Sequence, residues 1–185
     1  MALETERLIL DIWRSDDWTR FRPIATDVEV MRYITGGVPW IDERIRSFVD
    51  RQIESYRTRG FCRWKLLRKP AGNLIGFCGV GIWRDGLEPE IGWWLARAYW
   101  GRGLATEAAA EALDDAFERV GLERVVSIAM PENRASTRIM EKLGLDFDGE
   151  FESEGVRLVR YAMDRVRYRE IGRHPAGSRR SAQVS

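Results

Sequence analysis

Apolar and polar residues alternate along several short segments of the chain, as expected of β-strands. Residues 7–14 place apolar side chains at every second position, which predicts a strand near the N-terminus. Residues 61–68 and 74–83 are rich in β-branched and aromatic residues, and the short turn-forming run between them predicts an antiparallel hairpin. Residues 90–96 extend this meander by a third strand.

Apolar residues at three- and four-residue spacing predict three longer helices. Residues 41–59 form the first of them, which ends at Gly60. The second covers residues 104–120, with an alanine-rich apolar stripe on one face, acidic residues elsewhere, and Gly121 suited to its C-terminal cap. The third covers residues 133–143.

Strands and helices are interspersed in the second half of the chain. Residues 124–130 predict a strand, and two further strands flank the turn at Glu154 and Gly155. This order predicts an α/β (α+β) fold: one domain over residues 1–168, built on a central, mostly antiparallel mixed sheet of about seven strands flanked by helices. Residues 169–185 lose all periodicity and carry four arginines against one glutamate, which predicts a flexible basic tail.

Composition narrows the class of protein. The 185 residues include 30 Lys and Arg against 29 Asp and Glu, a formal charge of +1, without the basic excess of a general nucleic-acid binder. No apolar run approaches the roughly 20 residues that cross a bilayer, and no basic-then-apolar leader opens the chain. We therefore expect a cytoplasmic protein with neither nucleic-acid nor membrane partners.

Cysteine and histidine are too few for several kinds of site. Only Cys62 and Cys78 occur, and the single histidine, His174, lies in the predicted tail. Neither a disulfide framework nor a zinc site can be assembled from them, and we predict no metal. A catalytic histidine is equally improbable, so any acid or base must come from another residue type.

The segment covering residues 100–107 joins a strand to the start of a long helix through two glycines. Such a turn directs unpaired backbone N–H groups from the positive end of the helix dipole, an arrangement that suits a phosphate or pyrophosphate. Gly101 and Gly103 allow close backbone approach, Arg102 adds positive charge, and Thr106 adds a hydroxyl. An ordinary tight turn, in which the glycines only relieve strain, is the alternative.

The run Trp100-Gly101-Arg102-Gly103-Leu104-Ala105-Thr106-Glu107-Ala108 resembles the acetyl-CoA pyrophosphate loop of the GNAT superfamily of N-acetyltransferases. The pattern of that family is Gln/Arg-x-x-Gly-x-Gly/Ala, and Trp100 at its first position is typical of the RimJ/RimL-like branch. Residues 5–10, 90–95, 133–136 and 141–145 resemble blocks of the same branch, in the same order.

The resemblance implies that acetyl-CoA binds where the sheet splays open, near the end of the strand over residues 90–96. Pantetheine would pair with backbone groups around Trp94, Leu95 and Ala96, a mode that suits an amide-rich arm. The other implied contacts are with the pyrophosphate, from Gly101, Arg102, Gly103, Leu104, Ala105 and Thr106, and with the far wall, from Asn133 and Ser136.

Acetyl transfer to an amine needs a base, an oxyanion donor and a proton for the departing thiolate. Glu90 is the candidate base, with a pKa that its apolar neighbours would raise, although a structural carboxylate is the alternative. The backbone N–H near Leu95 is the candidate oxyanion donor. Many members of the superfamily place a tyrosine where this chain has Met140, and a methionine cannot protonate a thiolate. We therefore predict that the Ser136 hydroxyl donates a hydrogen bond to the departing sulfur. An ordinary hydroxyl on the helix face, without a catalytic role, is the alternative.

The leading hypothesis is an acetyl-CoA-dependent N-acetyltransferase. The acetyl group would move to a primary amine, on a protein N-terminus or a small molecule, by direct attack in a ternary complex. The alternatives are a non-catalytic acyl-CoA-binding regulatory module and a purely structural domain that uses the glycine turn for packing. The amine acceptor is then the expected partner, and the resemblance allows either a monomer or a homodimer.

Overall fold

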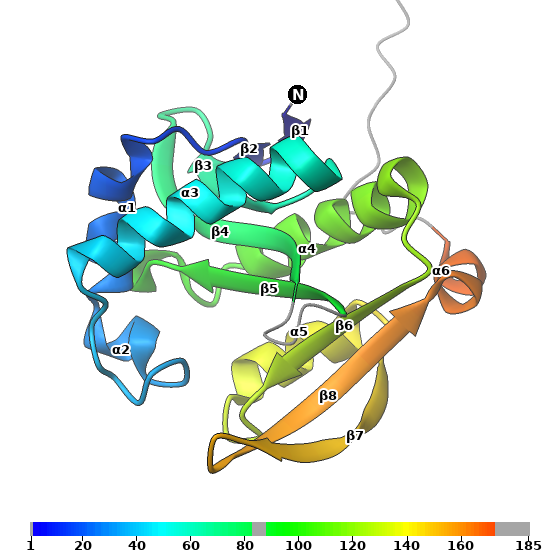
Figure 1. Ribbon diagram of the computed structural model, residues 1–185. Coiled ribbons are helices and arrows are strands. Elements are labelled where there is room, and N and C mark those ends of the chain that lie inside the picture. Colours follow the sequence, from blue (N-terminus) through cyan, green and yellow to red (C-terminus); the bar gives the residue numbers. More distant parts are fainter. Residues whose placement is uncertain (1, 83–87, 173–185) are drawn as a thin grey trace, which may run out of the picture.

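Eight strands form one mixed sheet in the computed structural model, which describes residues 2–82 and 88–172 (Figure 1). Their order is β1-β2-β3-β4-β5-β6-β8-β7, and only β5 and β6 are parallel neighbours. The predicted fold class is confirmed, and the unpredicted strand is β1, which is too short to show an alternation. The bounds are β1 (Leu3–Glu4), β2 (Leu8–Asp11), β3 (Arg63–Arg68), β4 (Asn73–Ile82), β5 (Pro89–Leu95), β6 (Arg124–Ala129), β7 (Asp146–Ser153) and β8 (Val156–Asp164).

Six α-helices flank the sheet within the described ranges. Figure 1 shows α3 in front of β3 and β4, and α4 behind them. A π-helical turn, Ala116–Val120, continues α4 as far as Gly121, whose φ of 82° closes it as expected. The helices are α1 (Asp17–Ala25), α2 (Val28–Met31), α3 (Asp42–Arg59), α4 (Leu104–Asp115), α5 (Arg134–Lys142) and α6 (Arg165–Ile171).

Two apolar clusters hold these layers together. On the side of α1 and α3, buried aromatic rings pack on β4, with the ring centroids of Phe48 and Phe77 5.1 Å apart. On the side of α4, small side chains let the helix approach the sheet closely: Ala108, Ala109, Ala112 and Ala116 are all buried. Each large apolar side chain contributes about 1.5–3 kcal/mol when it leaves water, so both layers are firmly fixed to the sheet.

The acidic residues of α4 lie away from its alanine stripe, yet most of them are buried. Other segments cover them and supply partners: Glu107 contacts the N-terminal segment, and Asp115 pairs with Arg119 at 2.5 Å. Asp114 accepts a hydrogen bond from the Tyr168 hydroxyl at 3.0 Å. The pattern of polar and apolar residues in α4 does not reveal that these acidic residues are buried, because the segments that bury them lie far away in the sequence.

Helix α6 crosses the boundary that the sequence predicts at residues 168 and 169. Residues up to Ile171 are helical, so the start of the predicted tail is wrong by at least three residues. The helix has no apolar stripe to reveal it and is fixed by Tyr168, whose ring stacks on Phe117 at 4.7 Å between centroids. The rest of the predicted tail, residues 173–185, and Trp83 at the end of the predicted strand lie outside the described residues.

Candidate active site

The sheet opens between its two parallel strands. β5 and β6 pair only at Glu90 and Val126, and the Ser127 hydroxyl then donates a hydrogen bond to the Ile91 carbonyl at 3.0 Å. Beyond this point no strand in the described part of the chain pairs with that side of β5. The predicted splay is therefore present, at the predicted strand.

Backbone groups along a strand point alternately to its two sides, which identifies the groups that face the opening. The Ala96 N–H donates to the Ile75 carbonyl on β4 at 2.8 Å, so this N–H and the backbone groups of Trp94 are directed toward β4, while the Ala96 carbonyl accepts from the Tyr99 N–H. The backbone groups of Trp93 and Leu95 face the other way, into the opening. The groups left open are thus both backbone groups of Trp93 and the Leu95 N–H, since the Leu95 carbonyl accepts a hydrogen bond from the Trp100 indole. The expectation of free groups at Trp94 and Ala96 is wrong.

The turn after β5 (residues 100–103, the glycine loop) is anchored to that strand. The Trp100 indole N–H donates to the Leu95 carbonyl at 2.7 Å, which accounts for the residue that replaces the Gln or Arg of the family pattern. Gly101 and Gly103 have φ angles of 69° and 74°, a left-handed conformation that glycine adopts without strain. The turn thus needs its glycines for backbone geometry.

Helix α4 begins at this loop with its first N–H groups open. Gly103 is the N-cap and supplies no side-chain acceptor. The N–H groups of the first turn have no acceptor within the helix, and they lie at the positive end of its dipole. The start of α4 can therefore bind an anion, as the sequence predicts.

A cavity of about 450 Å³ joins the opening to the start of α4. Two predicted contact residues do not line it: Ala96, whose N–H is bonded to β4, and Arg102, whose guanidinium lies near the Tyr99 ring at 5.9 Å from its centroid. The predicted site residues that do line it are Glu90, Trp94, Leu95, Gly101, Gly103, Leu104, Ala105, Thr106, Asn133 and Ser136.

The far wall of the cavity comes from α5. Asn133 caps this helix, because its Oδ1 accepts a hydrogen bond from the Ser136 N–H at 3.2 Å. Ser136 and Met140, one turn further on, both line the cavity. The thioether of Met140 has no proton to donate, so the Ser136 hydroxyl is the polar group that this pair offers.

Glu90 lies in the cavity wall and is only 6% exposed. Burial raises the pKa of Glu90, and an ion pair with the Arg63 guanidinium partly opposes this shift. Arg63 comes from β3 and reaches over β4, where glycine leaves room: a Cβ on Gly81 would lie 3.0 Å from Arg63 Nε. The sequence predicts the direction of the shift but not the ion pair.

Helix α2 and the turn after it supply a wall that no motif predicts. Glu29, Val30, Tyr33 and Ile34 line the same cavity as Glu90. The only local signal is the N-cap at Asp27, which predicts a short helix and says nothing about its neighbours.

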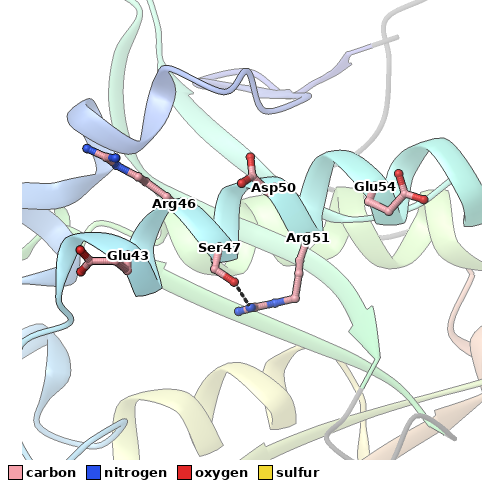
Figure 2. A pocket seen from close by; sticks show the side chains of 6 residues that line it. All are labelled: Glu43, Arg46, Ser47, Asp50, Arg51 and Glu54. Carbon is pink, nitrogen blue, oxygen red and sulfur yellow. Dashed lines mark hydrogen bonds between the residues drawn. The ribbon is translucent and has the colours of Figure 1, made fainter.

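A second hollow, on the exposed face of α3, offers no comparable chemistry (Figure 2). Figure 2 shows acidic and basic side chains along this face, and Arg51 donates a hydrogen bond to Ser47 at 2.6 Å. It is an ordinary solvated helix surface. The residues that line it are Glu43, Arg46, Ser47, Asp50, Arg51 and Glu54.

Metal sites and membrane spans are both absent from the part of the chain that the structure describes. No three His, Cys, Asp or Glu side chains gather there in a way that would hold a metal ion. No described helix is both long and apolar enough to span a bilayer.

The two cysteines are buried and free. Burial raises the pKa of Cys62 to about 12 and raises that of Cys78 as well. Because the thiolate is the reactive form, we expect neither to react with Ellman's reagent at about pH 8 in the folded protein, and both to react in denaturant. Reaction of either thiol without denaturant would contradict this burial.

Comparison with known proteins agrees with this geometry. A family model described as an acetyltransferase (GNAT) domain matches residues 7–146. The uncharacterized N-acetyltransferase YnaD of Bacillus subtilis is 28% identical over 152 residues, which cover 82% of this chain and 86% of the relative. An acetyltransferase of the GNAT family from Bacillus anthracis has a TM-score of 0.75 at 26% identity, covering 90% of this chain and 99% of that one.

A more distant structure shows the same fold. RimL, a ribosomal alpha-N-protein acetyltransferase solved in complex with coenzyme A, has a TM-score of 0.72 at 16% identity, with 89% of this chain and 98% of that chain covered. The prediction of an N-acetyltransferase is confirmed by the family match and the relatives. The chain belongs to the acetyltransferase (GNAT) family, whose members use acetyl-CoA.

Proposed function

We propose that this protein transfers an acetyl group from acetyl-CoA to a primary amine in a ternary complex. One observation carries the proposal: a single cavity joins the unpaired side of β5 to the open N-terminus of α4. The first suits an amide-rich arm, which pairs with backbone groups as a strand would. The second suits a diphosphate.

Different residues would bind the pantetheine arm and the pyrophosphate of the cofactor. The backbone groups of Trp93 would hold the pantetheine arm, and the N–H groups at the start of α4 would hold the pyrophosphate. Arg138 and Lys142 of α5 also line the cavity and add positive charge on the far wall. This division modifies the expected contacts, since Trp93 takes the place of Trp94 and Ala96.

Glu90 is the proposed base. The amine nitrogen attacks the thioester carbonyl, a C–N bond forms, the C–S bond breaks, and the amine gives up a proton to Glu90 directly or through water. A pKa raised by burial makes the carboxylate a stronger base than an exposed glutamate. The Leu95 N–H faces the opening, where it can stabilise the oxyanion.

Ser136 is the proposed partner of the departing thiolate. Its hydroxyl donates a hydrogen bond to the sulfur, and the proton lost by the amine finally resides on free CoA. Met140, which offers no proton at the position of the family's usual tyrosine, favours a second candidate function: a regulatory module that binds acyl-CoA without turnover.

The acceptor is a primary amine on a protein N-terminus or a small molecule, as in the RimJ/RimL-like branch. The wall formed by α2 supports an acceptor site opposite the cofactor, since Glu29 and Glu90 both line the cavity there.

The test follows thiol release from acetyl-CoA against a panel of N-terminal peptides and small amines, with free CoA binding measured in parallel. Turnover with one acceptor class supports the enzyme and selects its substrate. Tight CoA binding without turnover across the panel supports the regulatory module. A protein that does not bind CoA at all would overturn both readings.

A further inference from the structure

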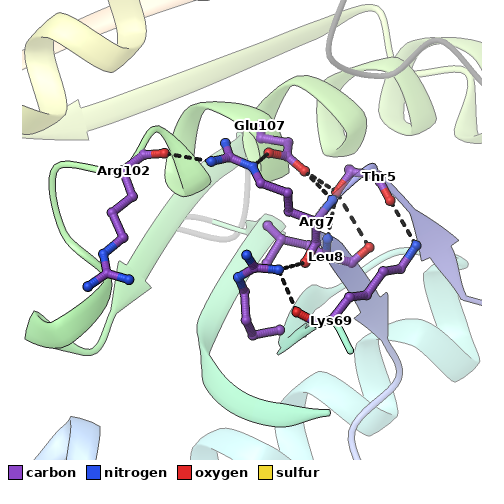
Figure 3. A network of polar contacts seen from close by, with 7 residues as sticks. Thr5, Arg7, Leu8, Lys69, Arg102 and Glu107 are labelled. Carbon is purple, nitrogen blue, oxygen red and sulfur yellow. Dashed lines mark hydrogen bonds and ion pairs between the residues drawn. The ribbon is translucent and has the colours of Figure 1, made fainter. Parts of the chain in front are cut away.

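A polar network joins the start of the chain to the first turn of α4 (Figure 3). Glu107 lies at its centre. Its Oε1 accepts a hydrogen bond from the Thr5 hydroxyl at 2.5 Å and another from the Arg7 backbone N–H at 2.9 Å. Its Oε2 pairs with Arg7 Nε at 2.6 Å. The N-terminal segment is therefore bound directly to α4, about 100 residues later in the sequence.

The same guanidinium also holds the glycine loop. Arg7 Nη1 donates a hydrogen bond to the Arg102 carbonyl at 2.9 Å, between the two left-handed glycines. A Cβ on Gly103 would lie 3.6 Å from Arg7 Nη2, so the side chain lies directly against the loop backbone. Arg7 does not line the cavity and contacts the loop from behind.

Arg7 is itself fixed from a third segment. Arg68 donates to the Arg7 carbonyl at 3.0 Å, and Lys69 donates to the Thr5 carbonyl at 2.8 Å. Arg68 is the last residue of β3, and Lys69 begins the turn to β4. Figure 3 shows Lys69 beside Thr5, and Arg7 extended toward Glu107 and the Arg102 carbonyl.

The charges of Glu107 and Arg7 bear on the binding of a pyrophosphate at the start of α4. Burial alone would raise the pKa of Glu107, but the hydrogen bonds from Thr5 and Arg7 lower it below its usual range, so the carboxylate is ionised at neutral pH. An unpaired negative charge in the first turn of α4 would repel a pyrophosphate. The Arg7 guanidinium neutralises this charge.

We infer that Arg7, held by Glu107 and Thr5, is a positioning residue for coenzyme A, which fixes the glycine loop so that the N–H groups of α4 face the pyrophosphate. This inference rests on the proposed function. The residue acts through the loop and touches neither the acetyl group nor the acceptor, so its effect is confined to ligands that carry the pyrophosphate.

The experiment compares the wild type with Arg7→Lys, since a single ammonium cannot reach the carboxylate and the loop carbonyl in the same fork geometry. We expect the Kd of CoA, measured by calorimetry, to rise about tenfold, the scale of one charge-assisted hydrogen bond. The kcat/KM for S-acetylpantetheine, which lacks the pyrophosphate, stays within about twofold of the wild type.

A matched control comes from the other end of the same helix. Arg119 likewise forks between a carboxylate, that of Asp115, and a backbone carbonyl, that of Gly60 at 2.8 Å. Arg119→Lys should lower stability to a similar degree and leave the Kd of CoA unchanged. An unchanged Kd in Arg7→Lys, an equal loss with S-acetylpantetheine, or an equal rise in Arg119→Lys overturns the inference.

A second measurement needs neither ligand nor activity. In hydrogen exchange, the amides of residues 101–106 should exchange faster in Arg7→Lys than in the wild type or Arg119→Lys. Unchanged exchange there overturns the inference even in a protein that binds CoA, whereas a wild type without CoA binding refutes the proposed function and, with it, the role of Arg7 toward CoA. If Arg7→Lys does not fold, Glu107→Gln, which removes the ion pair that holds Arg7, takes its place in the exchange measurement, and the amides of residues 101–106 should again exchange faster than in the wild type.

Discussion

Gly103→Asp is expected to abolish measurable CoA binding while the protein stays folded. The substitution brings a carboxylate among the N–H groups at the start of α4, where the pyrophosphate would bind, and like charges repel strongly at that distance. The left-handed φ of 74° costs an aspartate about 1–2 kcal/mol, which a folded domain tolerates. Calorimetric titration should show the Kd of CoA raised at least about a hundredfold.

Gly121→Asp provides a close control at the opposite end of the helix. Gly121 has a φ of 82°, and its Cβ would lie 3.6 Å from an arginine Nη2, that of Arg165. Gly103 has nearly the same angle and the same distance to Arg7. Gly121→Asp, whose charge opposes the helix dipole, should lose at least as much stability as Gly103→Asp in thermal melts, but only Gly103→Asp should lose CoA. Normal CoA affinity in Gly103→Asp would remove the pyrophosphate site from α4.

Glu90→Gln should lower kcat about a hundredfold or more, the usual contribution of a general base. The KM for acetyl-CoA should change little, because the carboxylate acts on the amine and not on the cofactor. The direction of the pH dependence follows from the role of Glu90. A general base acts in its deprotonated form, so the rate falls as the pH drops through its pKa. Because burial raises that pKa, the fall begins at a higher pH than for an exposed glutamate.

The acidic limb of this profile should disappear in Glu90→Gln. Asp17→Asn separates catalysis from stability, since Asp17 is a buried carboxylate paired with Lys65 at 2.6 Å and lies outside the cavity. If Asp17→Asn loses as much activity as Glu90→Gln, or if the acidic limb survives in Glu90→Gln, Glu90 is a structural carboxylate and not the base.

Local patterns predict those elements whose cause is local. The apolar and aromatic runs of β3 and β4, the apolar stripe of α3 and the glycine after it all act within a few residues, and the structure confirms each element. Helix α6 is an element that local patterns do not predict. Its fixation depends on Tyr168 meeting Phe117 from another helix, and nothing in its own seven residues shows an apolar stripe.

In the candidate site too, some parts could be predicted from the local sequence and others could not. The glycine loop could be predicted, because Gly101 and Gly103 determine its backbone by themselves. The pairing of Glu90 with Arg63 could not, because it depends on the register of three strands and on the space above Gly81. The same holds for the contact of Arg7 with the loop.

The two ends of the sheet bear on how the protein behaves at high concentration. An exposed, straight and apolar edge strand recruits other chains and leads to aggregation. Here β1 is only two residues long, and β7 has a bulge between Phe147 and Gly149. Charged side chains also line β7, since Asp146, Asp148 and Glu150 pair with arginines and Glu152 follows, and an added strand would have to cover these charged groups. Intermolecular strand addition is therefore disfavoured at both edges. The open side of β5 is where we expect the sheet to pair with a ligand, the pantetheine arm of the proposed cofactor.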